Sequence, residues 1–280
     1  VSAARAAVIG GFQGTSDLEA AKRYGIRAIG TAAHAFTLLH DDERAAFDSQ
    51  VANLGPGTTL LVDTYDVAQG VANAVEAARA AGGELGAVRL DSGDLVAQAF
   101  KVRGQLDAMG ATSTRITVTS DLDEYAIAAL GAAPVDSYGV GTRLVTGSGV
   151  PTAALVYKVV AREDSGGGMV PVAKKSESKS TVGGMKVAGR VIGEEGYAAE
   201  ELLLVGVPLD EAADALQARG ARPLQIPLVV DGGIDPRMWG SEALARAQER
   251  HIRSRNELPY QAWRLSEGET AIPTRYEKAG

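Results

Sequence analysis

The fold of this chain is decided by the segment Ala87-Val88-Arg89-Leu90-Asp91-Ser92-Gly93-Asp94-Leu95. Successive side chains of a strand point to opposite faces, so the apolar residues share one face while Arg89 and Asp91 share the other. The segment therefore predicts a buried strand that carries a charge pair to the start of a helix. Two interpretations fit the pair. It is an internal salt bridge, or it presents an arginine to a carboxylate or phosphate ligand, which guanidinium geometry suits.

The same strand-then-helix order recurs along the first half of the chain. Short apolar runs predict strands at 26–31, 59–63, 88–91, 115–119 and 136–142. The strand starts recur at roughly 30-residue spacing, the size of a βαβ unit, so the strands are expected to be parallel. Ahead of them, Ser16 and Glu19 form a capping-box pattern for a helix that Gly25 ends.

The pattern changes after about residue 150. Runs at 153–162 and 169–175, joined by a glycine-rich turn, predict an antiparallel hairpin. From about Glu201 onward we expect a helix, then a strand at 224–230 and a basic helix at 241–256. The fold class predicted is α/β, an irregular parallel, TIM-like barrel over residues 1–200, followed by a C-terminal α/β extension over residues 201–280.

Composition excludes several classes of protein. The chain has 28 Lys and Arg against 35 Asp and Glu, a net charge of −7, which argues against a nucleic-acid binder. Cysteine is absent, so there is no thiolate nucleophile, disulfide or cysteine-bound zinc. No apolar run reaches membrane-spanning length and no signal peptide is present, so a cytoplasmic location is expected. The first residue is Val1 rather than Met, which predicts that further residues once preceded it.

Polar residues stand where each predicted parallel strand ends. They are Thr31, Asp63-Thr64, Asp91-Ser92, Thr119-Ser120 and Gly141-Thr142. Sites of parallel α/β proteins lie at the carboxyl ends of the strands, so we expect these residues to converge there. Capping of the following helix is the alternative for Ser92 and Ser120 taken singly. Glycines next to Thr142 add a candidate phosphate cradle.

Histidine and lysine offer fewer candidates. His34 follows Gly30-Thr31-Ala32-Ala33 and is expected at the same edge, whereas His40 and His251 are interpreted as structural. No His, Asp and Glu cluster has the spacing of transition-metal ligands. Magnesium held by one or two carboxylates and substrate phosphates remains compatible with the sequence. Four lysines near the predicted hairpin are either solvated or close to phosphates: Lys174, Lys175, Lys179 and Lys186.

Six motifs together resemble the nicotinate phosphoribosyltransferase family. They are the segments 14–16, 30–34, 61–66, 88–95, 120–124 and 138–142, in the order of the family and at compatible spacing. Segments 222–229 and 256–259 continue the likeness, which covers nearly the whole chain. The resemblance implies a barrel of the type II phosphoribosyltransferase kind. It also implies an enzyme that joins nicotinate to phosphoribosyl pyrophosphate, forming nicotinate mononucleotide for NAD salvage.

The resemblance assigns roles to residues. The family couples the reaction to ATP hydrolysis through a phosphorylated histidine, and His34 matches that position. Arg89 matches the arginine associated with nicotinate, and Asp91 and Asp94 match the acidic pair near the ribose and Mg²⁺. The remaining substrate-binding positions implied are Thr15, Ser16, Ser92, Ser120, Gly141 and Thr142, the last two in the loop for the 5′-phosphate.

The chain departs from the family pattern in three respects. Ala35 replaces a serine after the motif histidine, and Asp17 replaces an asparagine. The N-terminal domain of the family is not among these residues. In the family that domain supplies an aromatic residue that sandwiches the pyridine ring across a dimer interface, and a basic stretch that contacts phosphoribosyl pyrophosphate. The chain is therefore expected to act as a homo-oligomer or with an N-terminal fragment that packs on residues 201–280, without nucleic acid or membrane.

Two alternatives to this enzyme remain open. One is a catalytically silent remnant or subunit that needs a partner to supply the N-terminal domain. The other is a relative that acts on nicotinamide or quinolinate. Quinolinate has two carboxylates and would call for more basic residues at the strand ends than Arg89 alone.

Overall fold

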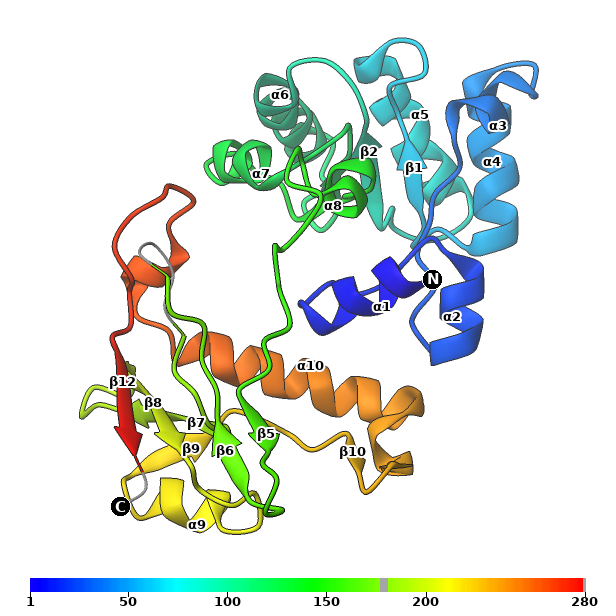
Figure 1. The fold of residues 1–280 in the computed structure, drawn as a ribbon. Coiled ribbons are helices and arrows are strands. Elements are labelled where there is room, and N and C mark those ends of the chain that lie inside the picture. Colours follow the sequence, from blue (N-terminus) through cyan, green and yellow to red (C-terminus); the bar gives the residue numbers. More distant parts are fainter. Residues whose placement is uncertain (177–180, 279–280) are drawn as a thin grey trace. The chain divides into compact units, whose positions relative to one another are not determined.

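The computed structural model describes residues 1–176 and 181–278 and divides the chain into two compact units (Figure 1). Unit 1 comprises Val1–Ala28 together with Ala154–Gly280, and unit 2 comprises Ile29–Ala153. The boundary that the sequence predicts at residue 200 instead falls inside a strand of unit 1, β8 (Ala198–Val205). Each unit has its own apolar core and is described by itself.

Unit 2 is built on a parallel sheet whose strands follow one another in sequence order. The strands are β1 (Thr59–Leu61), β2 (Ala87–Leu90), β3 (Arg115–Val118) and β4 (Ser137–Tyr138). All three neighbouring pairs are parallel. The βαβ spacing thus predicted the parallel direction of these four strands correctly, although β1, β3 and β4 are shorter than their apolar runs. Side chains such as Leu60, Val88 and Ile116 are fully buried and form the core between the sheet and its helices.

Four of the six helices of unit 2 begin at aspartates. They are α3 (His34–Leu38), α4 (Glu43–Leu54), α5 (Val67–Ala80), α6 (Leu95–Ala108), α7 (Glu124–Leu130) and α8 (Thr142–Thr146). The carboxylates of Asp42, Asp66, Asp94 and Asp123 each accept a hydrogen bond from a backbone N–H in the first turn of α4, α5, α6 and α7. These caps fix where the chain turns from strand or loop into helix.

Unit 1 contains a helical cluster and a mixed sheet. Helices α1 (Ser2–Ile9), α2 (Leu18–Tyr24) and α10 (Gly240–Asn256) meet around Val8, Ala20 and Leu244. The sheet has the order β12-β8-β7-β9, with β7 at Lys186–Ile192, β9 at Ala221–Pro223 and β12 at Thr274–Lys278. Helix α9 (Ala212–Gln217) places Leu216 on its core.

Short elements complete unit 1. The predicted hairpin forms as β5 (Ala161–Glu163) and β6 (Met169–Pro171), which pair antiparallel but are much shorter than expected. A second small hairpin joins β10 (Val229–Val230) to β11 (Gly233–Ile234). Two 3₁₀ turns, η1 (Pro236–Met238) and η2 (Tyr260–Trp263), flank α10.

Several expectations for these elements are wrong. Residues 26–31 form no strand, because Ile26 packs with the helical cluster and only an isolated bridge joins Thr15 to Ala28. Asp17 rather than Ser16 caps α2. The helix expected from Glu201 is part of β8, whose inward-facing Leu202 and Leu204 alternate as a strand requires. Most of the strand expected at 224–230 is irregular.

The protein is an α/β fold, but a closed barrel is not formed by the strands that the structure describes. Those strands group into two four-stranded and two two-stranded sheets, and the parallel sheet ends at β1 and β4. Among residues 1–176 and 181–278 there is also no helix with both the length and the apolar character needed to cross a membrane.

Candidate active site

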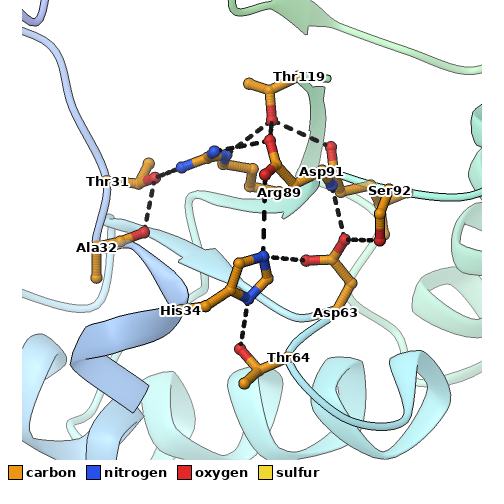
Figure 2. A network of polar contacts seen from close by, with 10 residues as sticks. Thr31, Ala32, His34, Asp63, Thr64, Arg89, Asp91, Ser92 and Thr119 are labelled. Atoms are coloured by element: carbon orange, nitrogen blue, oxygen red, sulfur yellow. Dashed lines mark hydrogen bonds and ion pairs between the residues drawn. The ribbon is translucent and has the colours of Figure 1, made fainter. Parts of the chain in front are cut away.

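A connected polar network lies at the carboxyl ends of β1, β2 and β3 (Figure 2). Its members come from three strand ends and from the segment that leads into α3. They are Thr31, His34, Asp63, Thr64, Arg89, Asp91, Ser92 and Thr119. All belong to unit 2, so one rigid scaffold of parallel strands positions them. The predicted convergence is confirmed for the polar residues that follow β1, β2 and β3, and Thr31 and His34 join them although no strand precedes these two.

Arg89 lies at the centre of the network. Its Nη2 atom forms an ion pair of 2.8 Å with Oδ1 of Asp91, Nη1 donates to the Thr31 hydroxyl at 2.7 Å, and Nε donates to the Thr119 hydroxyl at 2.9 Å. The internal salt bridge therefore exists. The guanidinium still has more N–H groups than these contacts use, and 20% of the side chain is exposed. The two interpretations of the charge pair are thus compatible with each other.

Asp91 is held in its ionised form. Its Oδ1 atom also accepts a hydrogen bond from the Thr119 hydroxyl. Partial burial alone would raise the pKa of Asp91, but the hydrogen bonds from Thr119 and Arg89 and the positive charges of Arg89 and His34 outweigh burial and lower it. The carboxylate is therefore a fixed negative charge beside the arginine.

Asp63 is a site residue that sequence reasoning noted only as a strand end. Its Oδ2 atom accepts hydrogen bonds from the Asp91 backbone N–H at 2.8 Å and from the Ser92 hydroxyl at 3.0 Å. These bonds tie the end of β1 to the turn before α6. Its Oδ1 atom is buried and has no hydrogen-bond partner in the described part of the chain. Only 3% of this side chain is exposed.

His34 brings an imidazole to the two carboxylates. Its Nδ1 atom lies 3.0 Å from the Thr64 hydroxyl, which orients the ring. Its Nε2 atom lies 3.9 Å from Oδ1 of Asp63 and 3.8 Å from Oδ2 of Asp91. The side chain is 39% exposed, and its Nε2 atom is flanked by the two carboxylates. An imidazole held by a hydroxyl at one nitrogen can act as a nucleophile or proton carrier at the other.

Other predicted site residues lie outside this network. Asp94 caps α6 by accepting from the Ala97 N–H at 3.0 Å. Ser120 has φ of 110° and Asp121 has φ of 46°, so a strained turn follows β3. Gly141 and Thr142 begin α8 and are exposed, which leaves their role as a phosphate loop a prediction.

Three further sets of candidates lie elsewhere. Thr15 and Ser16 belong to unit 1, where Thr15 accepts a hydrogen bond from the Asp17 N–H, so their role in substrate binding stays a prediction. Lys186 of β7 donates to the carbonyl of Gly184 in the same unit. Lys174 and Lys175 are exposed, and Lys179 lies outside the described residues.

Gly139 is a second residue that sequence reasoning did not single out for its packing. A methyl group on its Cα would lie 2.5 Å from the Thr119 methyl group. A side chain there would therefore displace the threonine that bridges Arg89 and Asp91. The only sequence signal was the glycine pair at 139 and 141, interpreted as a phosphate loop.

The role of Asp91 and Asp94 in holding magnesium stays a prediction, because the expected ion is shared with substrate phosphates. Oδ1 of Asp91 accepts from Arg89 and Thr119, and Oδ1 of Asp94 caps α6. Within residues 1–176 and 181–278 no group of three His, Cys, Asp or Glu side chains could hold a metal ion. We therefore assign no chemical step to a protein-bound metal.

Comparisons with known proteins place the network in context. No protein-family model matches the chain. It is 51% identical over 283 residues to "Nicotinate phosphoribosyltransferase pncB1" of Mycobacterium tuberculosis, covering 98% of this chain and 59% of that protein. It is 41% identical over 204 residues to the nicotinate phosphoribosyltransferase of Bacillus subtilis, covering 70% of this chain and 41% of that protein.

Two solved structures share the fold. The human nicotinic acid phosphoribosyltransferase has a TM-score of 0.65 at 22% identity and matches 99% of this chain and 64% of its own. The nicotinate-nucleotide pyrophosphorylase of Pyrococcus furiosus has a TM-score of 0.63 at 23% identity and matches 90% of this chain and 61% of its own. The chain thus spans about three fifths of the proteins that it matches over most of its length.

Proposed function

The chain belongs to the nicotinate phosphoribosyltransferase family, and from this premise we propose that it is the catalytic part of such an enzyme. The complete protein would transfer the phosphoribosyl group of phosphoribosyl pyrophosphate to nicotinate, releasing pyrophosphate and forming nicotinate mononucleotide for NAD salvage. ATP would be hydrolysed in a coupled step. The chain covers 59% of its mycobacterial relatives, so the activity is proposed for the protein that contains it.

Arg89 is proposed to bind the carboxylate of nicotinate. The ion pair with Asp91 and the bonds to Thr31 and Thr119 hold the guanidinium plane in one orientation. The N–H groups that these contacts leave can form a planar fork with a carboxylate, which a lysine cannot reproduce. A ring held in this way presents its nitrogen in a constant position, and positioning of the nucleophile accelerates a displacement.

His34 is proposed to accept a phosphoryl group from ATP at Nε2. The Thr64 hydroxyl occupies Nδ1, so Nε2 is the nitrogen left for the reaction. Asp63 and Asp91 lie within 4 Å of that atom and attract an imidazolium ion, but they would repel a phosphoryl group bound there. The free energy of phosphorylated His34 would therefore be raised. This would favour loss of its phosphoryl group once substrates are bound.

Loss of pyrophosphate leaves positive charge on the ribose carbon in the transition state. Fixed carboxylates that face such a centre stabilise it without reorganisation. The ionised Asp91 is proposed for this role, with Asp94 near the ribose. Ser92, Ser120, Gly141 and Thr142 are proposed to hold the remaining hydroxyls and the 5′-phosphate.

The finer architecture is also part of the proposal. The four-stranded parallel sheet of unit 2 would contribute to a TIM-like barrel of the type II phosphoribosyltransferase kind in the complete protein. The protein would work in the cytoplasm as a homo-oligomer or with a separate N-terminal fragment. Magnesium would accompany the phosphates of the substrates rather than a protein cluster.

One observation carries the proposal. The chain is 51% identical to a named nicotinate phosphoribosyltransferase over 98% of its length, and it folds Arg89, Asp91 and His34 into one network. The test supplies the full-length protein with ATP, phosphoribosyl pyrophosphate and one of nicotinate, nicotinamide or quinolinate, and separates products by chromatography. Product from nicotinate alone is expected. Product from nicotinamide or quinolinate would assign that base as the substrate instead. No product from any of the three bases would indicate a catalytically silent protein.

A further inference from the structure

Glu43 is a buried carboxyl group that the proposed reaction does not use. It is the first residue of α4, and only 5% of it is exposed. Its Oε2 atom accepts a hydrogen bond of 3.1 Å from the Asn73 side chain of α5. Its Oε1 atom is buried and has no partner in the described part of the chain. A carboxylate in that position would lack the partners that a buried charge requires.

Glu43 lies against the end of the strand that carries Asp63. A methyl group on Gly70 of α5 would lie 2.3 Å from the Val62 carbonyl oxygen and 3.2 Å from Oε2 of Glu43. The carboxyl group and this carbonyl therefore both approach α5 at the same glycine. Val62 is fully buried and directly precedes Asp63 in the chain.

The charges around Glu43 are of its own sign. Burial raises the pKa of Glu43, the negative charges of Asp66 and Asp63 raise it further, and the Asn73 hydrogen bond opposes these effects without cancelling them. In the described part of the chain no cation offsets these charges, and Arg44, the next residue, pairs with Asp48 and Glu76 on the exposed side.

We propose that Glu43 is a positioning residue held as a neutral carboxylic acid beneath Asp63. In this form Glu43 still accepts the Asn73 hydrogen bond, whereas an ionised group would bury a charge that this single bond and an unpartnered Oε1 atom leave uncompensated. The neutral form also adds no further negative charge near the Asp63 carboxylate, whose Oδ1 atom lies 3.9 Å from Nε2 of His34. The proposal depends on the packing of unit 2 and not on the reaction assigned to the protein.

A direct test observes the carboxyl group itself in the 280-residue chain. Carbon-13 NMR of side-chain carboxyls, assigned with Glu43→Gln, should show Glu43 protonated at pH 6, where exposed glutamates are ionised. A Glu43 resonance with the ionised shift at pH 6, titrating near the ordinary glutamate value of 4.5, would overturn the proposal. This measurement needs no substrate, so its outcome is separate from that of the activity assay.

A second test follows stability against pH in matched variants. A group whose pKa is raised by folding stabilises the protein below its unfolded pKa, and that contribution is lost as pH rises toward the folded value. The folding equilibrium constant of the wild type, relative to Glu43→Gln, should therefore fall above pH 4.5 by up to about tenfold per pH unit. The control is Glu124→Gln, the same change at an exposed first residue of a helix, α7, which should give a flatter ratio.

A third measurement separates positioning from simple packing. The His34 ring resonances should stay at their wild-type positions in Glu43→Gln, which keeps the shape and a donor, and should move in Glu43→Ala. If both variants leave the ring unchanged, Glu43 does not position the Asp63–His34 contact.

Discussion

Arg89 and Asp91 form an ion pair of 2.8 Å although a single residue separates them along the chain. The pleat of β2 places both side chains on one face, and Thr119 of the next strand joins them from the side. The pair is thus a prebuilt unit in which the carboxylate orients the guanidinium. A ligand that meets this arginine does not have to order it first, which lowers the entropic cost of binding.

Arg89→Lys in the full-length protein should weaken the use of nicotinate. A lysine keeps the charge but loses the fork and two of the three internal bonds, so a loss of about 2 kcal/mol, or roughly thirtyfold in kcat/KM, is expected. Steady-state kinetics with nicotinate measure this change. Arg115→Lys, at an exposed position of β3, is the control and should behave as the wild type. Unchanged kinetics in an active Arg89→Lys enzyme would show that Arg89 does not bind nicotinate.

His34 should become labelled when the active protein is incubated with γ-labelled ATP. A phosphoryl group on an imidazole nitrogen is acid-labile, so the label should disappear on acid treatment and be absent from His34→Ala. His251→Ala, which alters a histidine of α10, should label normally. Some ATP-independent synthesis should survive in His34→Ala, because transfer of the phosphoribosyl group to nicotinate does not itself consume ATP. Label that persists in His34→Ala would place the phosphoryl group on another residue.

Asp91→Asn should change the acid stability of the chain. Folding lowers the pKa of Asp91, so its contribution to stability is present above the ordinary value of 3.8 and is lost as pH falls below that value toward the folded pKa. The stability advantage of the wild type over Asp91→Asn should therefore be full near neutral pH and shrink in strong acid. Chemical unfolding at a series of pH values measures it, with Asp41→Asn at an exposed site as control. A pH-independent difference would contradict the ion pair.

Gly139→Ala should damage the site without touching a polar group. Its new methyl group would meet the Thr119 methyl group at 2.5 Å, so Thr119 or β4 must shift. Overpacking of this kind costs about 1–3 kcal/mol. Thermal unfolding and nicotinate kinetics should both be impaired. Gly104→Ala on α6 is the control, because nothing lies within 4 Å of the added methyl group. A Gly139→Ala protein with wild-type stability would show that Thr119 is not held as described.

The isolated 280-residue chain should have little or no activity and should self-associate. Unit 1 exposes large apolar side chains at Leu155, Val156, Tyr157 and Val159. Adjacent apolar side chains of this size in water favour association. Light scattering should report a mass above that of the monomer, and the double variant Leu155→Ser, Tyr157→Ser should lower it. A supplied N-terminal fragment should restore activity. A monodisperse monomer with full activity alone would contradict this expectation.

The sequence predicted the first half of the fold because local signals there agree with one another. The first three parallel strands are short, largely buried runs, and the helix after each begins at an aspartate that caps it. The second half was harder to predict. Leu202 and Leu204 alternate over too few residues to exclude a helix, and β12 joins β8 from 69 or more residues further along the chain, which no local pattern reveals.

The residues of the candidate site were likewise predicted only in part. The strand-end rule brought Asp91, Ser92 and Thr119 together correctly, because parallel strands end at one edge. His34 lies there too, although residues 26–31 ahead of it form no strand. Asp63 was seen only as a strand end, since its contacts with the Asp91 N–H and the Ser92 hydroxyl depend on the register of β1 against β2. Glu43 gave no signal at all. An acidic first residue is ordinary at a helix start, and only its packing against Gly70 distinguishes it.

Asp94 has a consequence for any ligand that approaches this edge. Its carboxylate already accepts from the Ala97 N–H and so holds the first turn of α6 closed. A ribose hydroxyl or cation that took the same oxygen would have to compete with the backbone, and ligand affinity would then be linked to fraying of the helix end. Ligand binding at the site and loss of order in the first turn of α6 would then be two parts of one coupled equilibrium.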